Sequence, residues 1–202
     1  MALFVPFNRN ILFAIAYTLM LPKFFIRMKK RGGYRANFHE RFGRFSPEVE
    51  KRLGEKKRIW IHAVSVGEAN LAGNVIQELR QRLPGVSFII STTSSPGRAV
   101  CENLAHPDDV VIYLPVDFPS HIRRALPKIN FDTFILTESE FWPNIIRAMK
   151  KREKNLFLVN GRVSDKSAPN YKRLKYFFGP VFDCFNVMLV QGELDKERLI
   201  AA

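Results

Sequence analysis

From residue 59 onward, short apolar runs alternate with amphipathic stretches. Each apolar run has the length of a strand and is bounded by charged or turn-forming residues. Six runs predict strands over Ile59–Val64, Val86–Ser91, Val110–Leu114, Thr133–Thr137, Leu156–Asn160 and Val187–Gln191. Helical spacing predicts helices over Glu68–Leu83, Pro96–Leu104 and Pro143–Lys151, and another beginning near Pro119. This alternation predicts an α/β fold, a parallel sheet with helices on both faces.

Before this region, residues 1–35 join an apolar leader to a basic segment. The uninterrupted apolar run, Ile11–Leu21, is short for an unstrained membrane span. No small-residue cleavage site follows it, so we interpret residues 1–35 as an uncleaved membrane-anchor helix with a basic juxtamembrane segment. The anchor either spans the bilayer or lies in its interface; the alternative is a buried helix of a soluble protein. Residues 36–57 are interpreted as a connector with one short helix, and residues 58–202 as the α/β domain.

The chain carries a formal net charge of +13, which implies an anionic partner; the alternative is a generally basic, solvated surface. Six of the basic residues directly follow the apolar leader: Lys23, Arg27, Lys29, Lys30, Arg31 and Arg35. This placement favours a membrane surface, and no nucleic-acid partner is expected because no recognition motif is present. Cys101 and Cys184 have no metal-ligand spacing, so we expect buried thiols and no metal site.

In a parallel sheet, ligands bind at the carboxyl ends of the strands, so polar residues there are the candidates. Glu68 follows the first strand at a helix start, as a general base or as an ordinary first-turn carboxylate. Glu138 and Glu140 follow the fourth strand and could join Glu68, or could be solvated loop carboxylates. The residue pattern leaves these roles open.

Two further strand ends carry polar loops. Residues 91–97, Ser-Thr-Thr-Ser-Ser-Pro-Gly, offer hydroxyls to a phosphate or sugar, or form an ordinary helix cap and turn. Residues 160–164, Asn-Gly-Arg-Val-Ser, precede clustered cations that suit a phosphate or a solvated basic loop equally.

Together these strings resemble the bacterial 3-deoxy-D-manno-octulosonic acid (Kdo) transferase family. The matching segments are HAVSVGE (62–68), STTSSPG (91–97), VIYLPVDFP (111–119), TESEFWPN (137–144) and NGRVSDKS (160–167), with ERFGR (40–44) before them. The resemblance implies that residues 58–202 form the Rossmann-like, acceptor-binding N-terminal domain of a GT-B glycosyltransferase. The family is longer, and the donor domain that would follow is expected to be absent from this sequence.

The resemblance also implies a function in lipopolysaccharide biosynthesis. The enzyme would be an inverting, metal-independent transferase that moves Kdo from CMP-Kdo to a lipid A precursor, without a cofactor, on the cytoplasmic side of the cell inner membrane. Glu68 would be the proton acceptor and Glu138 the transition-state stabiliser. The residues expected to bind substrate are Ser65, Gly67, Thr92, Thr93, Ser94, Glu140, Asn144, Arg162 and Ser164.

The family string usually reads Glu-Thr-Glu where this chain has Glu138-Ser139-Glu140, which keeps the carboxylate spacing. A lysine that the family places in its second domain has no counterpart here. We therefore expect the 202-residue chain alone to be inactive. The alternative function is a non-catalytic basic module that binds anionic lipid or a partner protein at the membrane surface.

Overall fold

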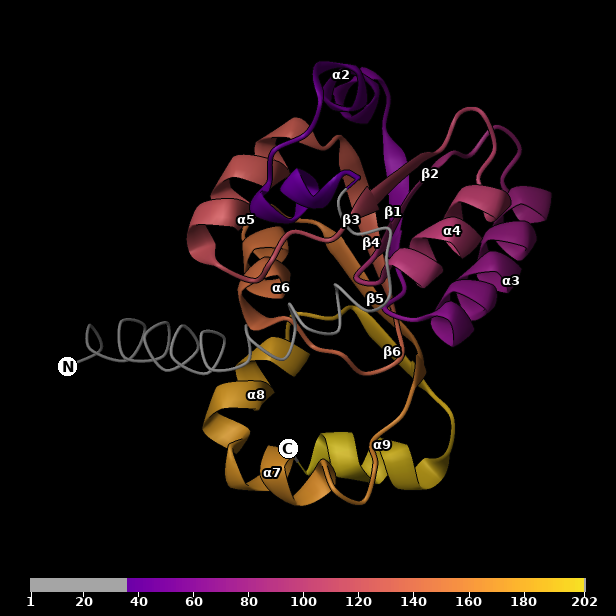
Figure 1. The fold of residues 1–202 in the computed structure, drawn as a ribbon. Coiled ribbons are helices and arrows are strands. Elements are labelled where there is room, and N and C mark those ends of the chain that lie inside the picture. Colours follow the sequence, from indigo (N-terminus) through magenta and orange to yellow (C-terminus); the bar gives the residue numbers. More distant parts are fainter. Residues whose placement is uncertain (1–35, 202) are drawn as a thin grey trace. The chain divides into compact units, whose positions relative to one another are not determined.

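Six parallel strands form one sheet in the order β3-β2-β1-β4-β5-β6 (Figure 1). The computed structural model describes residues 36–201, and residues 39–201 build the α/β unit that holds this sheet. The strands are β1 (Arg58–His62), β2 (Phe88–Thr92), β3 (Val110–Tyr113), β4 (Phe131–Thr137), β5 (Asn155–Gly161) and β6 (Val187–Val190). All six strands predicted from the apolar runs are confirmed.

The strand order reverses direction between β1 and β4. The chain first builds outward from β1 through β2 to β3, then returns and builds the other way from β4 to β6. The two central strands pair directly, with His62 opposite Leu136 near their carboxyl ends. The loops that leave these two strands therefore diverge at one edge of the sheet, the position at which ligands bind in open α/β sheets.

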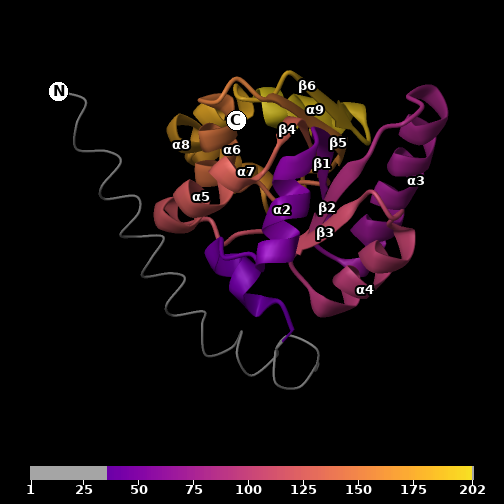
Figure 2. The same ribbon diagram turned by 90° about the horizontal axis from the view of Figure 1, so that it is seen from above.

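Helices cover both faces of the sheet (Figure 2). The helices that follow the strands are α3 (Val66–Arg82), α4 (Ser95–Leu104), α5 (Pro119–Ala125), α6 (Pro143–Lys150), α7 (Ala168–Arg173), α8 (Lys175–Phe182) and α9 (Glu193–Ile200), with the 3-10 turn η2 (Leu126–Lys128) after α5. Helices α3 and α4 pack on one face, and α5, α6 and α8 pack on the other.

The two faces have different cores. The α3–α4 side is built from small and aliphatic residues such as Ala69, Ala72 and Ile90. On the other side, Trp60 lies edge-on to Phe131 and Phe134, with ring centroids 5.0 and 5.4 Å apart. Such aromatic pairs stabilise the fold beyond the area that they bury.

The segment that precedes β1 packs on this same unit. It contains the 3-10 turn η1 (Phe38–Phe42) and α2 (Pro47–Glu55), whose N-terminus is capped by Ser46. Leu53 of α2 is fully buried, and Phe45 is 8% exposed. Residues 39–57 thus contribute to the core of the domain that they lead into.

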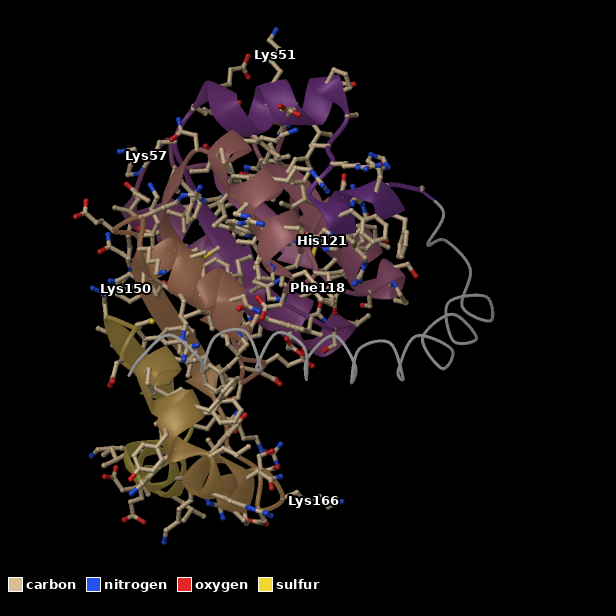
Figure 3. The ribbon with its side chains drawn as sticks, turned by 90° about the vertical axis from the view of Figure 1, so that its left-hand side faces the viewer. Lys51, Lys57, Phe118, His121, Lys150 and Lys166 are labelled. Carbon is tan, nitrogen blue, oxygen red and sulfur yellow. The ribbon has the colours of Figure 1, made fainter. Side chains whose placement is uncertain are left out.

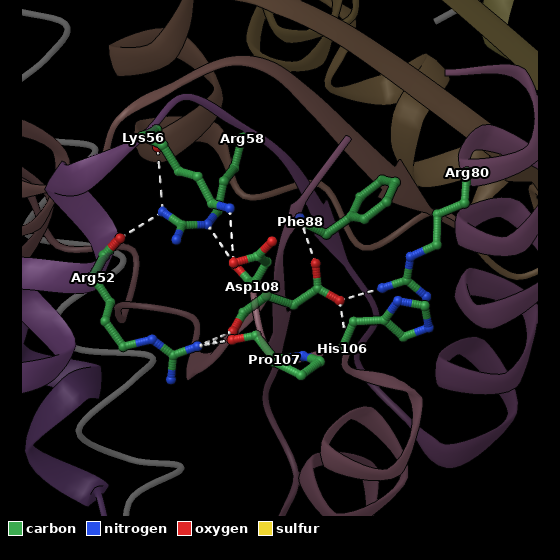
Figure 4. A network of polar contacts seen from close by, with 9 residues as sticks. Arg52, Lys56, Arg58, Arg80, Phe88, His106, Pro107 and Asp108 are labelled. Carbon is green, nitrogen blue, oxygen red and sulfur yellow. Dashed lines mark hydrogen bonds and ion pairs between the residues drawn. The ribbon is translucent and has the colours of Figure 1, made fainter. Parts of the chain in front are cut away.

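At the amino ends of the strands, buried charges are paired (Figure 4). Asp109 accepts hydrogen bonds from the backbone N–H of Phe88 at 2.7 Å and of His106 at 2.8 Å, and it forms an ion pair with Arg80. The Arg58 guanidinium donates to the carbonyls of Asp108 and Arg52. Each buried charge at this end is compensated by a group of opposite sign or by main-chain dipoles.

The predicted membrane anchor lies in residues 1–35, outside the described residues. Within residues 36–201, no helix is both long enough and apolar enough to cross a bilayer. Both cysteines are buried free thiols, as expected.

Candidate functional site

Glu68 is held rigidly at the start of α3. The sequence Ser65-Val-Gly-Glu68 forms a capping box: the Ser65 hydroxyl accepts a hydrogen bond from the Glu68 N–H and lies 3.1 Å from the Glu68 Oε1. The second carboxylate oxygen, Oε2, accepts the N–H of Val64 at 2.7 Å. With both oxygens bound and only 6% of its surface exposed, the carboxylate has a defined orientation.

The environment of Glu68 suits a proton acceptor. Burial raises the pKa of Glu68, and the nearby Glu138 raises it further, while the hydrogen bonds from Val64 and Ser65 oppose the shift. A carboxylate with a raised pKa is a stronger base, and the hydrogen bonds from Val64 and Ser65 favour the ionised form of Glu68.

Glu138 and Glu140 approach Glu68 from the end of β4. Glu138 has the left-handed backbone φ of 59°, while its N–H still donates to Val159 of β5 at 3.0 Å. The chain thus turns sharply without losing its place in the sheet, which is a strained conformation for a residue with a side chain.

The Glu140 side chain reaches the surface, yet its pKa is raised to about 7. Desolvation by the surrounding protein is the main cause, and repulsion from Glu68 and Glu138 adds to it. Solvent on the open side of Glu140 screens part of this repulsion. The structure therefore brings together the three carboxylates that the sequence places at two separate strand ends.

The hydroxyl-rich loop between β2 and α4 is mostly bound to main chain. Thr92 and Thr93 each place Oγ1 3.3 Å from the carbonyl of Val64, and Ser94 caps α4 by accepting the Gly97 N–H at 3.1 Å. A Cβ on Gly97 would lie 2.6 Å from the Thr92 Oγ1, so glycine is required for this close approach. The predicted cap-and-turn role is confirmed for Ser94, and substrate contact stays a prediction.

Asn144 has a structural role that the sequence did not indicate. Its side-chain amide donates to the Asp117 carbonyl at 2.7 Å, and the Asp117 carboxylate accepts the N–H groups of Asn144 and Ile145 at 3.0 and 2.7 Å. Asp117, which is 1% exposed, thereby caps the N-terminus of α6 from a distant loop. In the sequence, the signal for Asp117 was its position in the family-like segment VIYLPVDFP, which by itself indicates no role for this residue.

The loop after β5 lies beside the loop after β4. The Arg162 N–H donates to the Ser139 hydroxyl at 2.7 Å, and the Arg162 side chain is exposed. Ser164 and Ser167 pair through their hydroxyls at 2.9 Å. Gly67, next to Glu68, is exposed, and a Cβ added there would meet only the Ser65 hydroxyl, at 4.0 Å, so small ligand groups can approach this position.

A buried polar network supports the site from behind. Glu40 accepts the Tyr113 N–H and an Arg98 N–H, each at 2.7 Å, and Arg98 lies 4.8 Å from the centre of the Tyr113 ring. Arg41 donates to the Thr93 carbonyl and its own carbonyl accepts the Val116 N–H at 2.8 Å. Through these contacts, the ERFGR segment (residues 40–44) holds the β2–α4 loop in place.

His62, fully buried at the end of β1, is neutral. Its Nδ1 lies 3.0 Å from the Ser91 carbonyl, so that nitrogen carries the hydrogen. Burial lowers the His62 pKa to about 3, and the positive charge of Arg41 lowers it further. His62 therefore supports the strand end and does not exchange protons near neutral pH.

The described residues also form a surface cavity, which lies away from these carboxylates. A surface cavity of about 430 Å³ opens between α3 and α4, lined by Gly73, Ile76, Gln77, Arg80, Gln81, Leu104 and His106, none of which is a predicted site residue. Among residues 36–201, no group of three or more His, Cys, Asp or Glu side chains is arranged to hold a metal ion.

A parallel six-stranded α/β domain with a fixed, buried carboxylate at the point where strand order reverses is consistent with a Rossmann-like glycosyltransferase domain. Comparison with known proteins agrees: residues 36–202 match the family model described as 3-Deoxy-D-manno-octulosonic-acid transferase (kdotransferase). The match covers most of the chain. The chain belongs to this Kdo transferase family.

Individual relatives extend this result. The chain is 31% identical over 194 residues to a bifunctional glycosyltransferase/methyltransferase of Fusobacterium nucleatum, covering 95% of this chain and 29% of that protein. It is 27% identical over 193 residues to the 3-deoxy-D-manno-octulosonic acid transferase of Chlamydia pneumoniae, covering 95% and 44%. The Rickettsia bellii transferase is 33% identical over 140 residues, covering 69% and 33%. The chain spans less than half the length of these relatives.

Proposed function

We propose that this chain is the acceptor-binding half of a GT-B glycosyltransferase that transfers Kdo from CMP-Kdo to a lipid A precursor. Membership in the Kdo transferase family supports the reaction class. The observation that carries the proposal is the orientation of Glu68, whose two oxygens are held by Val64 and Ser65 at the reversal point of the sheet.

In the proposed step, Glu68 takes the proton of an acceptor hydroxyl while that oxygen forms a bond to the anomeric carbon of Kdo. The bond from this carbon to the CMP phosphate breaks, and CMP leaves with the electron pair. A single displacement of this kind inverts the anomeric carbon. Positive charge develops on the sugar in the transition state, and the carboxylate of Glu138 is suited to stabilise it.

The substrates and the location complete the proposal. CMP-Kdo would bind to a donor domain outside this chain, and the anionic acceptor would contact Arg162, Ser164 and the hydroxyls of residues 92–94. No cofactor or metal takes part in the proposed step. The enzyme would work on the cytoplasmic side of the inner membrane, with residues 1–35 as its anchor.

Replacing Glu68 tests the assignment of the base. In the longest natural chain that joins these 202 residues to a donor domain, Glu68→Gln should lower kcat for Kdo transfer by about 10²–10⁴-fold, because the amide cannot accept the proton. Glu78→Gln is the matched control, since Glu78 lies on the same helix with its side chain 62% exposed, and it should leave kcat unchanged. Unaltered transfer by Glu68→Gln would remove Glu68 from the mechanism.

A second candidate is a non-catalytic module that binds anionic lipid, which the net charge of +13 favours. Titrating the chain separately with CMP-Kdo and with a lipid A precursor tests whether this chain binds the acceptor while the donor binds to another domain. We expect binding of the lipid alone. Turnover by the 202-residue chain without a donor domain would contradict the proposal.

A further inference from the structure

The connection between α7 and α8, residues 171–178, forms an exposed corner that is both basic and apolar. Its residues 172–176, Lys-Arg-Leu-Lys-Tyr, are all exposed, and Tyr176 and Leu174 expose 87% and 49% of their surface. Leu174 and Tyr176, separated by Lys175 alone, place two large apolar groups in solvent on one corner, and clustered exposed apolar groups mark contact sites.

Charge identifies the partner that this corner fits. Residues 166–182 contain Lys166, Lys172, Arg173 and Lys175 and no acidic residue. Lys175 also lies over the Tyr176 ring, with its Nζ 5.3 Å from the ring centre. Cations around an exposed tyrosine and leucine are the composition of segments that lie in the head-group region of anionic bilayers.

The inner side of the corner is rigidly joined to the carboxylate site. The Tyr171 ring packs edge-on to Phe141 at 6.1 Å and Phe182 at 5.6 Å, and Phe141 contacts Phe182 at 4.8 Å. Phe141 directly follows Glu140, so these rings connect the corner to the β4–α6 loop. Tyr171 also lies within electrostatic reach of Glu140, which adds to the rise in pKa that burial causes in this tyrosine.

Within the unit formed by residues 39–201, the corner lies at one end. Figure 3 shows Lys166 and the α7–α8 region at the opposite end from Lys51 on α2. This is the end toward which the strands point their carboxyl termini, where Glu68 also lies. A surface bound here would be presented to the carboxylates.

We propose that the α7–α8 corner is a docking surface for an anionic lipid bilayer, with Leu174 and Tyr176 inserted among the head groups and Lys172, Arg173 and Lys175 on lipid phosphates. The inference rests on the proposed function only in that the acceptor would be lipid-bound. Docking at this corner brings the head groups of the bilayer beside Glu140 and Glu68.

A site-specific probe tests this in the full chain, because residues 1–35 could also bind lipid. Tyr176→Trp places a fluorophore at the corner, and Leu83→Trp places one at the carboxyl end of α3, where Leu83 is 47% exposed. Both variants are mixed with phosphatidylglycerol vesicles that carry brominated acyl chains, without sugar nucleotide, and the emission of the wild-type tryptophans is subtracted. Trp emission at position 176 should shift to shorter wavelength and be quenched, whereas that at position 83 should not.

Charge reversal supplies the second arm. In the Tyr176→Trp background, Lys172→Glu with Lys175→Glu should abolish the quenching, as should phosphatidylcholine vesicles or high salt. Lys51→Glu with Lys57→Glu changes the net charge equally at the other end and should leave the quenching intact.

Three results would overturn the proposal: no quenching at position 176 while the chain floats with the vesicles, equal quenching at positions 83 and 176, or a concentration-dependent shift at position 176 without vesicles, which would assign the corner to self-association. The assay contains no sugar nucleotide. Failure of Kdo transfer would therefore leave a positive docking result standing, and failure of docking would leave Glu68→Gln as an independent test of the reaction.

Discussion

The two ends of the sheet treat buried charge in opposite ways. At the amino end, Asp109 is surrounded by two main-chain N–H groups and Arg80, and Arg58 is held by backbone carbonyls (Figure 4). At the carboxyl end, burial raises the pKa of Glu68 and of Glu140, and repulsion from the nearby Glu138 raises both further. The buried charges at the amino end are paired, whereas these three carboxylates place charge of a single sign close together.

This difference separates stability from function. Pairing at the amino end ties α2, α3 and the loop before β3 to the sheet. Like charges at the carboxyl end are unfavourable for folding but suit proton transfer, because they keep a base strong and a neighbouring carboxyl partly protonated. Both arrangements occur in one sheet because all the parallel strands have their carboxyl ends, where ligands bind, at the same edge.

The largest expected effect comes from removing a paired carboxylate at the amino end of the sheet. Asp109→Ala should lower the free energy of unfolding by about 3–5 kcal/mol, because Arg80 and two buried N–H groups lose their partner. Asp132→Asn is the control, since Asp132 is 48% exposed in a loose ion pair with Lys57, and it should change stability by less than about 0.5 kcal/mol. Denaturant unfolding of both variants measures the difference, and equal losses would refute the contrast.

An identical substitution at each end gives a smaller effect. Ser46 caps α2 and Ser65 caps α3, and replacing either with Ala should cost about 1 kcal/mol of stability. Only Ser65→Ala should also raise the Glu68 pKa, because the Ser65 hydroxyl now lowers it. Carboxyl-carbon NMR titration distinguishes the two; an unchanged Glu68 titration in Ser65→Ala would show that the capping box does not tune the base.

The smallest effect concerns the crowded carboxylates. The pKa of Glu140 is raised to about 7 in the folded chain, so the folded state holds its proton to higher pH than the unfolded state does. The stability that protonated Glu140 contributes is therefore fully present at pH values below the pKa of Glu140 in the unfolded chain. It is lost as the pH rises through 7. At pH above 7, Glu140→Gln should stabilise the fold by less than about 1 kcal/mol, since solvent screens the exposed side chain.

Unfolding measured well below and well above the Glu140 pKa checks this dependence. The gain should vanish at low pH, where wild type carries a neutral Glu140. Glu78→Gln, exposed on α3, should show no pH-dependent gain. A stabilisation of Glu140→Gln that did not depend on pH would mean that packing, rather than charge, is responsible.

Much of the fold was predictable because apolar runs and helical spacing are local properties. The six strands and helices α3, α4, α5 and α6 follow from them. Helices α7, α8 and α9 were not predicted: Pro169, Gly179 and Pro180 interrupt the pattern, and the aromatic residues of α8 show no clear polar face. Helices α7 and α8 are held by their rings, which pack on Phe141 and on one another, a tertiary contact. Helix α9 has no ring and is held by Asp195, which accepts the Val163 N–H, and by Arg198, which donates to the Val163 carbonyl.

For the site, the sequence determined which residue types stand at the strand ends, and it placed Glu68 at the start of the helix after the first strand. Only the tertiary structure decided that Glu68 meets Glu138 and Glu140, that the Asn144 amide is bound to Asp117, and that Glu40 supports the loop beside them. The physical reason is range. Periodicity and caps act within a few residues, whereas burial, repulsion and hydrogen bonds between loops depend on which strands the sheet places side by side.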